Sequence, residues 1–331
     1  MSETVLVAPQ KREIVNTNAP FQQEFYECEN YRAVKKVIKK LVKQNKAEGF
    51  FTLPAPVVFK WETENENSLL EISEEESFEN ARKYNISGNS AEIYNLKKDT
   101  GYFWRVNGCD CRRFFTDSTP PRWIKADGCM NIRDLGGERN REGKTLQQDM
   151  IFRGVKLEGL ATEEGIKALN DLGIRTEIDL RKEAVGKLEA SPLGEGVKYI
   201  SHVCNGYHDF LQKDSKEDTK ALIDYFADES NYPIYFHCHG GADRTGTLAF
   251  MLGAILGLDD ETLIRDYELT MISSPEKKMS RSRKNKIKEF LKLLHARNKN
   301  QTLGENAVDF LRECGVTEET FETIRKIMLV I

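Results

Sequence analysis

The residues best suited to chemistry lie in one short stretch, which reads His-Cys-His-Gly-Gly-Ala-Asp-Arg-Thr-Gly from His237 to Gly246. Within it, Cys238 and Arg244 are separated by five residues. Apolar runs flank the stretch, a short one before it and a longer one after it, at Tyr232–Phe236 and Thr247–Leu258. These runs are typical of a buried strand and a core helix. The stretch is therefore predicted to join a strand to the N-terminus of a helix.

Such a loop is suited to holding a tetrahedral oxyanion. Gly240, Gly241 and Gly246 free the backbone to turn its N–H groups inward, and the helix adds the positive end of its dipole. A cysteine beside this site is expected to be a thiolate. A lone cysteine is more often an inert core residue, but a flanking histidine, the acid Asp243 and the hydroxyl of Thr245 favour a functional loop.

The stretch resembles the phosphate-binding loop of the cysteine-dependent phosphatases. It most resembles the bacterial tyrosine phosphatase family whose loop carries its own Asp just before the Arg. The resemblance covers roughly residues 121–331. It implies an α/β fold of the cysteine-phosphatase type, with a central, largely parallel twisted sheet flanked by helices, and it implies neither a cofactor nor a metal.

The resemblance also implies a role for each polar group of the loop. Cys238 would attack phosphorus in line and form a phosphocysteine, while Arg244 and the loop amides hold the equatorial oxygens. Asp243 would protonate the leaving oxygen and later activate water, and the hydroxyl of Thr245 would stabilise the departing thiolate. The other loop residues are predicted to bind phosphate, namely His239, Gly240, Gly241, Ala242 and Gly246.

Polar residues near the predicted strand ends are candidates for supporting roles. His237 precedes the cysteine, and Asp179 and Arg181 lie at the end of a predicted strand at 175–180. The carboxyl ends of parallel strands commonly form the site in an α/β fold. Asp179 could orient Arg244 or hold a water molecule, but each of these two residues could equally form an ion pair with a neighbour.

The same resemblance implies roles for four further residues. Asp209, in the polar segment 204–209, is an alternative general acid, because many tyrosine phosphatases carry this acid on a mobile loop upstream of the cysteine. Arg133 and Arg153 lie in segments similar to the family and are predicted to brace the site, with Asp134 as their ionic partner.

The predicted substrate is a phosphorylated protein or peptide, with phosphotyrosine alone or both phosphotyrosine and phosphoserine hydrolysed. A phosphoinositide or inositol phosphate is the alternative substrate. Family members with phosphoinositide activity carry a Lys directly before the loop Asp, and Ala242 at that position argues against such a substrate. A phosphate-binding scaffold without activity is the alternative from another class, although such modules usually lose the Cys, the Arg or the acid.

Composition limits the remaining function classes. The chain has 331 residues, a net charge of −4 and 39% hydrophobic residues, which indicates a globular protein and argues against a nucleic-acid partner. No apolar window is long enough for a transmembrane segment, and the N-terminus lacks the pattern of a signal peptide, so a cytoplasmic location is expected. Seven scattered cysteines indicate free thiols, and Cys109 and Cys111 are predicted to be plain loop residues instead of a metal site.

Three parts are predicted along the chain. Residues 1–49 form an extension with a basic amphipathic helix from Tyr31 onward, whose lysines suit an acidic membrane or partner but whose apolar stripe also suits packing. Residues 50–118 are predicted to form a β-sandwich that resembles fibronectin type III, with Trp61 in the core and Tyr102 making a corner bond, and with one edge strand missing or supplied by earlier residues. Residues 119–331 form the phosphatase domain.

Within that domain the periodicity predicts helices and strands that alternate. A helix is predicted at 162–172, strands at 175–180 and 197–203, a helix that begins at 259–261 and runs through 267, and two helices within 307–331. The basic stretch 280–297 is predicted to be a helix, either packed on the core or covering the active site as a lid.

Overall fold

The computed structural model describes residues 4–29, 31–44, 46–184, 188–274 and 281–330. The chain forms two compact units, each built from two separate stretches of sequence. Unit 1 comprises Met1–Pro20 and Pro54–Ile124, and unit 2 comprises Phe21–Leu53 and Lys125–Ile331. This division differs from the three predicted parts, because residues 1–49 are shared between the two units instead of forming a separate extension.

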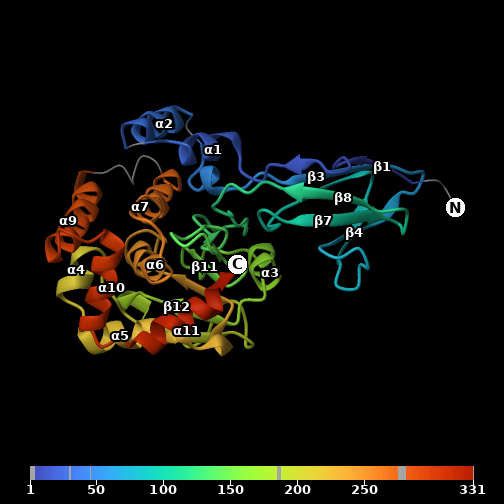
Figure 1. The fold of residues 1–331 in the computed structure, drawn as a ribbon. Helices are drawn as coiled ribbons and strands as arrows, with labels where there is room; N and C mark the ends of the chain where they lie inside the picture. Colours follow the sequence, from blue (N-terminus) through green and yellow to red (C-terminus); the bar gives the residue numbers. More distant parts are fainter. Residues whose placement is uncertain (1–3, 30, 45, 185–187, 275–280, 331) are drawn as a thin grey trace. The chain divides into compact units, whose positions relative to one another are not determined.

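Unit 1 contains two sheets of short strands (Figure 1). One has the order β1-β3-β6 and the other the order β2-β8-β7-β4-β5. Strands β1 and β2 come from the N-terminal residues, so both sheets receive a strand from before position 50. The bounds are β1 Val5–Ala8, β2 Ile14–Val15, β3 Val57–Glu62, β4 Asn67–Ser73, β5 Arg82–Ser87, β6 Ser90–Ile93, β7 Gly101–Val106 and β8 Arg112–Thr116.

Aromatic side chains from both sheets meet in the core of unit 1. The ring of Phe59 on β3 packs edge-on against Trp104 on β7 and Phe114 on β8, at centroid distances of 5.1 and 5.6 Å. Trp61 is buried with them, as predicted. The hydroxyl of Tyr102 accepts the backbone N–H of Lys97 at 3.0 Å. Strand β5 was not predicted, because its burial pattern places no residue fully in the core and its sequence therefore lacks an apolar signal.

Unit 2 is built on a five-stranded sheet with the order β13-β12-β14-β11-β9. The first four strands are parallel, and β9 is antiparallel to β11. The register places His237 at the end of β14 opposite Asp179 on β12 and Gly154 on β11, so three strands end at the same edge. The bounds are β9 Arg133–Asp134, β11 Ile151–Gly154, β12 Thr176–Asp179, β13 Lys198–Ser201 and β14 Ile234–His237, with a separate pair β10 Thr145–Leu146 and β15 Leu329–Val330.

Helices surround this sheet (Figure 1). Their bounds are α1 Pro20–Tyr26, α2 Tyr31–Lys43, α3 Glu163–Asn170, α4 His208–Gln212, α5 Lys216–Asp224, α6 Asp243–Ile255, α7 Asp260–Leu269, α9 Arg281–Arg297, α10 Leu303–Glu313 and α11 Glu318–Met328. The side chains of Thr162 and Asp259 cap α3 and α7, so the expected helix starts are confirmed. Helix α5 was not predicted, and α6 begins four residues earlier than its apolar run, at Asp243.

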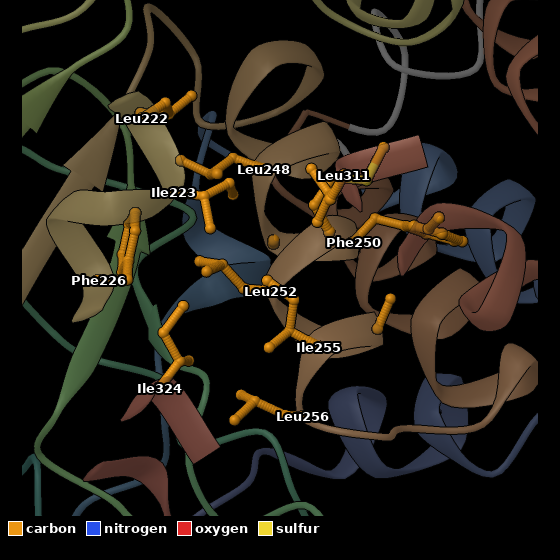
Figure 2. Close-up of a cluster of buried hydrophobic side chains, with 14 of the residues drawn as sticks. Leu222, Ile223, Phe226, Leu248, Phe250, Leu252, Ile255, Leu256, Leu311 and Ile324 are labelled. Carbon is orange, nitrogen blue, oxygen red and sulfur yellow. The ribbon is translucent and has the colours of Figure 1, made fainter. Parts of the chain in front are cut away.

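Helix α6 is the centre of the unit 2 core. From Thr245 to Ile255 all its residues are buried, which explains its near-continuous apolar sequence. Figure 2 shows Leu248, Leu252 and Ile255 of α6 among side chains from α5, α10 and α11. A helix buried on this scale holds its N-terminus, and the loop attached to it, in a fixed place.

The predicted basic amphipathic helix is α2, and its apolar stripe is buried. Val34, Val37, Ile38 and Leu41 are all covered, and α2 contacts the short 3-10 turn Thr270–Ile272 within unit 2. Of the two roles predicted for this helix, packing within the protein therefore accounts for its apolar stripe. Across the described ranges, no helix combines the length and the apolar composition that crossing a bilayer requires.

Candidate active site

The stretch 237–246 forms the predicted loop between strand β14 and helix α6. His237 is the last residue of β14, Cys238 follows it directly, and α6 begins at Asp243. Gly241 has a φ of +61°, and a Cβ at this position would lie 2.5 Å from the carbonyl oxygen of Gly154. Only glycine fits this position without displacing the neighbouring strand.

Two side chains hold the carbonyl groups of the loop. The Asn131 side-chain amide donates to the carbonyls of Gly240 and Gly241, at 3.2 and 3.0 Å. The Arg153 guanidinium donates to the Gly241 carbonyl at 2.7 Å. A loop whose carbonyls are fixed in this way can present its N–H groups to an anion. Arg153 therefore lies where the sequence predicted a brace, whereas the role of Asn131 was not foreseen.

The carboxylate that pairs with both predicted brace arginines is Asp266, on α7. Arg133 donates to it through Nε at 2.9 Å, and Arg153 donates to its other oxygen. Burial, which would raise the pKa of Asp266, is outweighed by the two guanidiniums, so its pKa is lowered. Asp134, the predicted ionic partner, accepts the backbone N–H groups of Gly136 and Asp149, at 2.7 and 2.8 Å, and so holds a turn.

Replacing Asp266 by asparagine is expected to destabilise unit 2, because two arginines with 0% exposure would lose the charge that balances them. We expect a loss of about 3 kcal/mol in the free energy of unfolding, at the low end for a broken buried pair, since the Asp266 side chain is 25% exposed. Far-UV circular dichroism in urea follows this loss, because the long helices lie in unit 2. Fluorescence follows unit 1, which holds Trp61, Trp104 and Trp123.

The matched control is Asp309→Asn, which removes an exposed carboxylate that pairs with Arg312. Its expected cost is below about 1 kcal/mol. If Asp266→Asn were as stable as this control, Asp266 would not be the residue that balances the two arginines.

Cys238 is 3% exposed. Burial by itself would raise the pKa of its thiol and is the largest single influence, but the hydroxyl and N–H of Thr245, the charge of Arg244 and the N–H of Ala242 together lower it. Thr245 is fully buried. Its hydroxyl acts on the Cys238 sulfur, but in the described part of the chain it forms no hydrogen bond that meets the usual geometry. The environment therefore favours a thiolate.

Asp243, the first residue of α6, is held by a pair of tyrosines. The Tyr207 hydroxyl lies 2.7 Å from an oxygen of Asp243 and 2.9 Å from the Tyr267 hydroxyl. Burial, followed by the charges of Tyr267 and Asp243, raises the pKa of Tyr207, so this phenol stays protonated and donates to the carboxylate. One hydroxyl carries one proton, so Tyr267 must then donate to Tyr207.

The position of Tyr207 is fixed independently of its hydroxyl. Its backbone has a φ of +58°, its N–H donates to the Thr247 hydroxyl at 2.7 Å, and its side chain is 2% exposed. Thr247 lies on the first turns of α6, so the segment that carries Tyr207 is attached to the same helix as Asp243. Sequence reasoning named this segment a polar loop and missed the tyrosine.

Arg244 is paired with Glu183 in this structure. Both terminal nitrogens of its guanidinium contact the Glu183 carboxylate, at 3.2 and 3.0 Å, and one lies 3.4 Å from the carbonyl of Leu180. The hydrogen bonds from Arg244 are the main reason why the pKa of Glu183 is lowered to about 2. Glu183 follows the predicted strand at 175–180 within four residues, but nothing in the sequence singled it out.

Asp179 contacts Arg181 and not Arg244. Its two oxygens accept from the Nε and a terminal nitrogen of Arg181, at 2.8 and 2.6 Å, and one also accepts the Tyr199 hydroxyl at 2.8 Å. Arg181 extends the pair to Glu158. Of the roles considered for Asp179 and Arg181, the structure therefore shows the ion pair with a neighbouring residue.

His237 lies behind the cysteine and faces the sheet. Its Nε2 is 2.8 Å from Glu177, its Nδ1 is 3.2 Å from the Cys238 carbonyl, and both side chains are fully buried. Burial alone would lower the pKa of His237, but Glu177 outweighs it and the pKa is raised. The histidine therefore orients the backbone at Cys238 instead of contacting a substrate.

A pocket of about 640 Å³ opens beside the start of α6. Asp243, Arg244, Asp209, Lys182 and Lys286 line it, and Cys238 is not among its lining residues. Asp209 lies on α4, where its carboxylate contacts Lys213 at 2.8 Å. The structure thus places Asp209 on the pocket wall and Asp243 in the loop itself.

The larger of the two pockets lies away from the loop. A pocket of about 940 Å³ lies against α10 and α11, but it contains no residue of the loop, and its Arg141 and Arg312 are paired with Glu305 and Glu318. In the ranges that the structure describes, no group of three or more His, Cys, Asp or Glu side chains could hold a metal ion. All seven cysteines are free thiols.

Comparisons with known proteins agree with the motif. A Cupriavidus necator protein that bears the name "putative tyrosine-protein phosphatase" is 26% identical over 165 residues, which are 43% of this chain and 60% of that protein. The chain therefore spans less than two thirds of this relative.

Two solved structures are also similar. One is the catalytic core of the PP-IP phosphatase SIW14 from S. cerevisiae in complex with citrate, with 16% sequence identity and a TM-score of 0.30. The match covers 46% of this chain and 92% of the SIW14 chain. TpbA from P. aeruginosa has 13% identity and a TM-score of 0.33 over 50% of this chain and 89% of its own. The model of one family, described as the tyrosine phosphatase family, matches residues 124–330. Because this match covers more than half of the sequence, the chain belongs to the tyrosine phosphatase family.

Proposed function

We propose that this chain is a phosphomonoester hydrolase that removes phosphate from tyrosine, or from both tyrosine and serine, in a phosphorylated protein or peptide. The observation that carries the proposal is the environment of Cys238, whose lowered thiol pKa results from Arg244, Thr245 and the backbone at the start of α6. Membership of the tyrosine phosphatase family supports the same reaction.

The reaction proceeds in two steps through a phosphocysteine. The Cys238 thiolate forms a bond to phosphorus as the bond to the substrate oxygen breaks, and Asp243 gives its proton to that oxygen. The Arg244 guanidinium exchanges Glu183 for the phosphate oxygens, which the N–H groups of His239, Gly240, Gly241 and Ala242 also contact. The predicted contact from Gly246 is not retained, because its N–H donates to the carbonyl of Ala242 at 2.9 Å within α6. Water then attacks phosphorus, Asp243 takes a proton from it, and the thiolate leaves with Thr245 beside it.

Tyr207→Phe is expected to weaken the general acid without removing it. Loss of one hydrogen bond to a charged group leaves Asp243 less well oriented, so kcat on a phosphotyrosine peptide should fall about tenfold. The fall on p-nitrophenyl phosphate should be smaller, because its leaving group needs little protonation. Steady-state kinetics on both substrates measure the difference.

Tyr267→Phe is the control, because it keeps the contact between Tyr207 and Asp243 and removes the hydroxyl that lies 2.9 Å from Tyr207. Its expected effect is below about threefold. Equal slowing of both substrates by Tyr207→Phe would show instead that Tyr207 only maintains the fold near the loop.

The substrate class is tested by a panel of phosphotyrosine and phosphoserine peptides, inositol phosphates and phosphoinositides with the unmodified chain. We expect the highest kcat/KM on phosphotyrosine peptides, because Ala242 supplies no cation within the loop for additional phosphates. A preference for inositol phosphates would support the alternative substrate class. Binding of tungstate without turnover of any compound would identify an inactive phosphate-binding module.

We further propose that unit 1 is a β-sandwich of the fibronectin type III kind that positions or docks the phosphatase instead of taking part in the reaction. The aromatic core shared by its two sheets and the bond from the Lys97 N–H to the Tyr102 hydroxyl support this assignment. Phe59→Ala, which disrupts that core, should lower turnover of a small aryl phosphate little, and a large loss would assign unit 1 a part in catalysis.

A further inference from the structure

The pocket beside Asp243 and Arg244 contains more positive charge than one phosphate requires. Lys182 comes from the segment after β12, and Lys286 comes from α9, so two distant parts of the chain bring cations to one pocket. Neither lysine forms a direct ion pair with a carboxylate among the residues that the structure describes, although the charge of Lys286 helps to lower the pKa of Asp209. Both side chains belong to exposed residues and can reach a ligand.

The other charges of the pocket are already engaged. Arg244 contacts Glu183 at 3.0 Å, and bound phosphate would occupy it in the proposed reaction. Asp209 is held by Lys213 at 2.8 Å, and Asp243 accepts the Tyr207 hydroxyl at 2.7 Å. Lys182 and Lys286 are therefore the pocket cations without a direct ion pair in the described part of the chain, and Lys286 acts on Asp209 without forming one.

We infer that Lys182 and Lys286 form a subsite for a second anionic group of the substrate, next to the phosphate that is hydrolysed. This inference deepens the proposed function and depends on it. The ligand is a phosphotyrosine peptide with an anion beside the phosphotyrosine, supplied by the carboxylate of Asp or Glu or by a second phosphorylated residue. A peptide suits this pocket better than an inositol phosphate does. With Ala242 in the loop, no loop cation is placed to bind a further phosphate on the same inositol ring.

The subsite should act on binding more than on the chemical step. Lysine ammonium groups at an exposed rim attract an anion equally before and during the reaction, so they lower KM and leave kcat nearly unchanged. Each exposed pair contributes up to about fivefold, and the two lysines together about tenfold. Screening by salt should reduce this contribution, since the groups are exposed.

The test compares three phosphotyrosine peptides that differ only beside the phosphotyrosine, with Glu, Ala or phosphoserine there. The unmodified chain should show a KM about tenfold lower for the Glu and phosphoserine peptides than for the Ala peptide, and the difference should shrink at high salt. Lys182→Gln with Lys286→Gln should abolish the preference while kcat on p-nitrophenyl phosphate stays the same. Lys292→Gln, also exposed on α9 but outside the pocket, should leave the preference intact.

The outcomes separate this inference from the proposed function. Equal KM values for the three peptides, or a preference that survives in the double variant, would overturn the subsite while hydrolysis of p-nitrophenyl phosphate upholds the phosphatase. A double variant that loses activity on inositol bisphosphate lipids but keeps its peptide preference would assign the lysines to a lipid headgroup and overturn the peptide subsite. Absence of turnover on every substrate would refute the proposed function itself.

Discussion

Replacing Cys238 by serine is expected to lower turnover of a phosphotyrosine peptide by at least about 10⁴-fold, because a serine hydroxyl is not ionised near neutral pH and cannot replace a thiolate nucleophile. The serine variant should still bind tungstate, a tetrahedral oxyanion, because Arg244 and the loop backbone remain. Thermal unfolding with and without tungstate measures this binding and shows that the variant is folded.

The lowered pKa of Cys238 gives the same residue a second, independent signature. A thiol with a lowered pKa is ionised at a pH where ordinary cysteines are not, so iodoacetamide should modify Cys238 first at mildly acidic pH. Burial raises the pKa of the comparison thiols Cys129 and Cys204, to about 12 for Cys129. Peptide mass spectrometry of the alkylated chain identifies the modified position, and tungstate should protect it.

Cys129→Ser is the matched control and should retain full activity and the fast alkylation at position 238. If Cys238 reacted no faster than the other cysteines, or if its alkylation rose only at the pH of a free thiol, the assignment of the nucleophile would be wrong. Activity that survives in the serine variant would place the nucleophile elsewhere in the chain.

The local parts of the site could be predicted because they depend on neighbours in sequence. Glycines, an apolar strand and an apolar helix determine a phosphate-type loop within one continuous segment, and β14 and α6 are found on either side of it. The partners that hold the loop could not be predicted, because they come from other strands and helices. In the sequence Asp266 is an ordinary acidic residue of a helix. Only the fold shows that it pairs with both Arg133 and Arg153.

The division of the N-terminal residues depends on similar long-range contacts. The Tyr26 hydroxyl donates to Glu138 at 2.7 Å, the Thr52 hydroxyl accepts the N–H of Asn131 at 3.1 Å, and Gly49 donates to the carbonyl of Ser273 at 2.8 Å. Periodicity could identify α2 but could not show which unit its apolar stripe packs against. A truncation that removes everything before position 120 would therefore also remove part of unit 2.

The structure sharpens the choice among the candidate acids. Asp179 is enclosed by Arg181 and Tyr199, and Asp209 is held by Lys213 on the pocket wall. Asp243 alone of the three lies in the loop, beside Arg244. We therefore expect Asp243, and neither of the others, to transfer the proton to the leaving group.

Asp243→Asn should reduce kcat/KM on a phosphotyrosine peptide by about 10²–10⁴-fold, because an amide cannot protonate the departing phenolate. On an aryl phosphate with an acidic phenol the loss should be far smaller, since that leaving group departs without a proton. A series of aryl phosphates of graded leaving-group pKa measures this dependence directly. The variant should depend on the leaving group more steeply than the unmodified chain.

Asp209→Asn is the matched control, because it removes a carboxylate from the same pocket without touching the loop. Its dependence on the leaving group should match that of the unmodified chain. Asp179→Asn is a poorer comparison, because it leaves the buried Arg181 with one carboxylate fewer and should destabilise the fold. If Asp209→Asn steepened the dependence while Asp243→Asn slowed all substrates equally, the acid would lie on α4. Asp243 would then act with Tyr207 in shaping the loop that holds the phosphate.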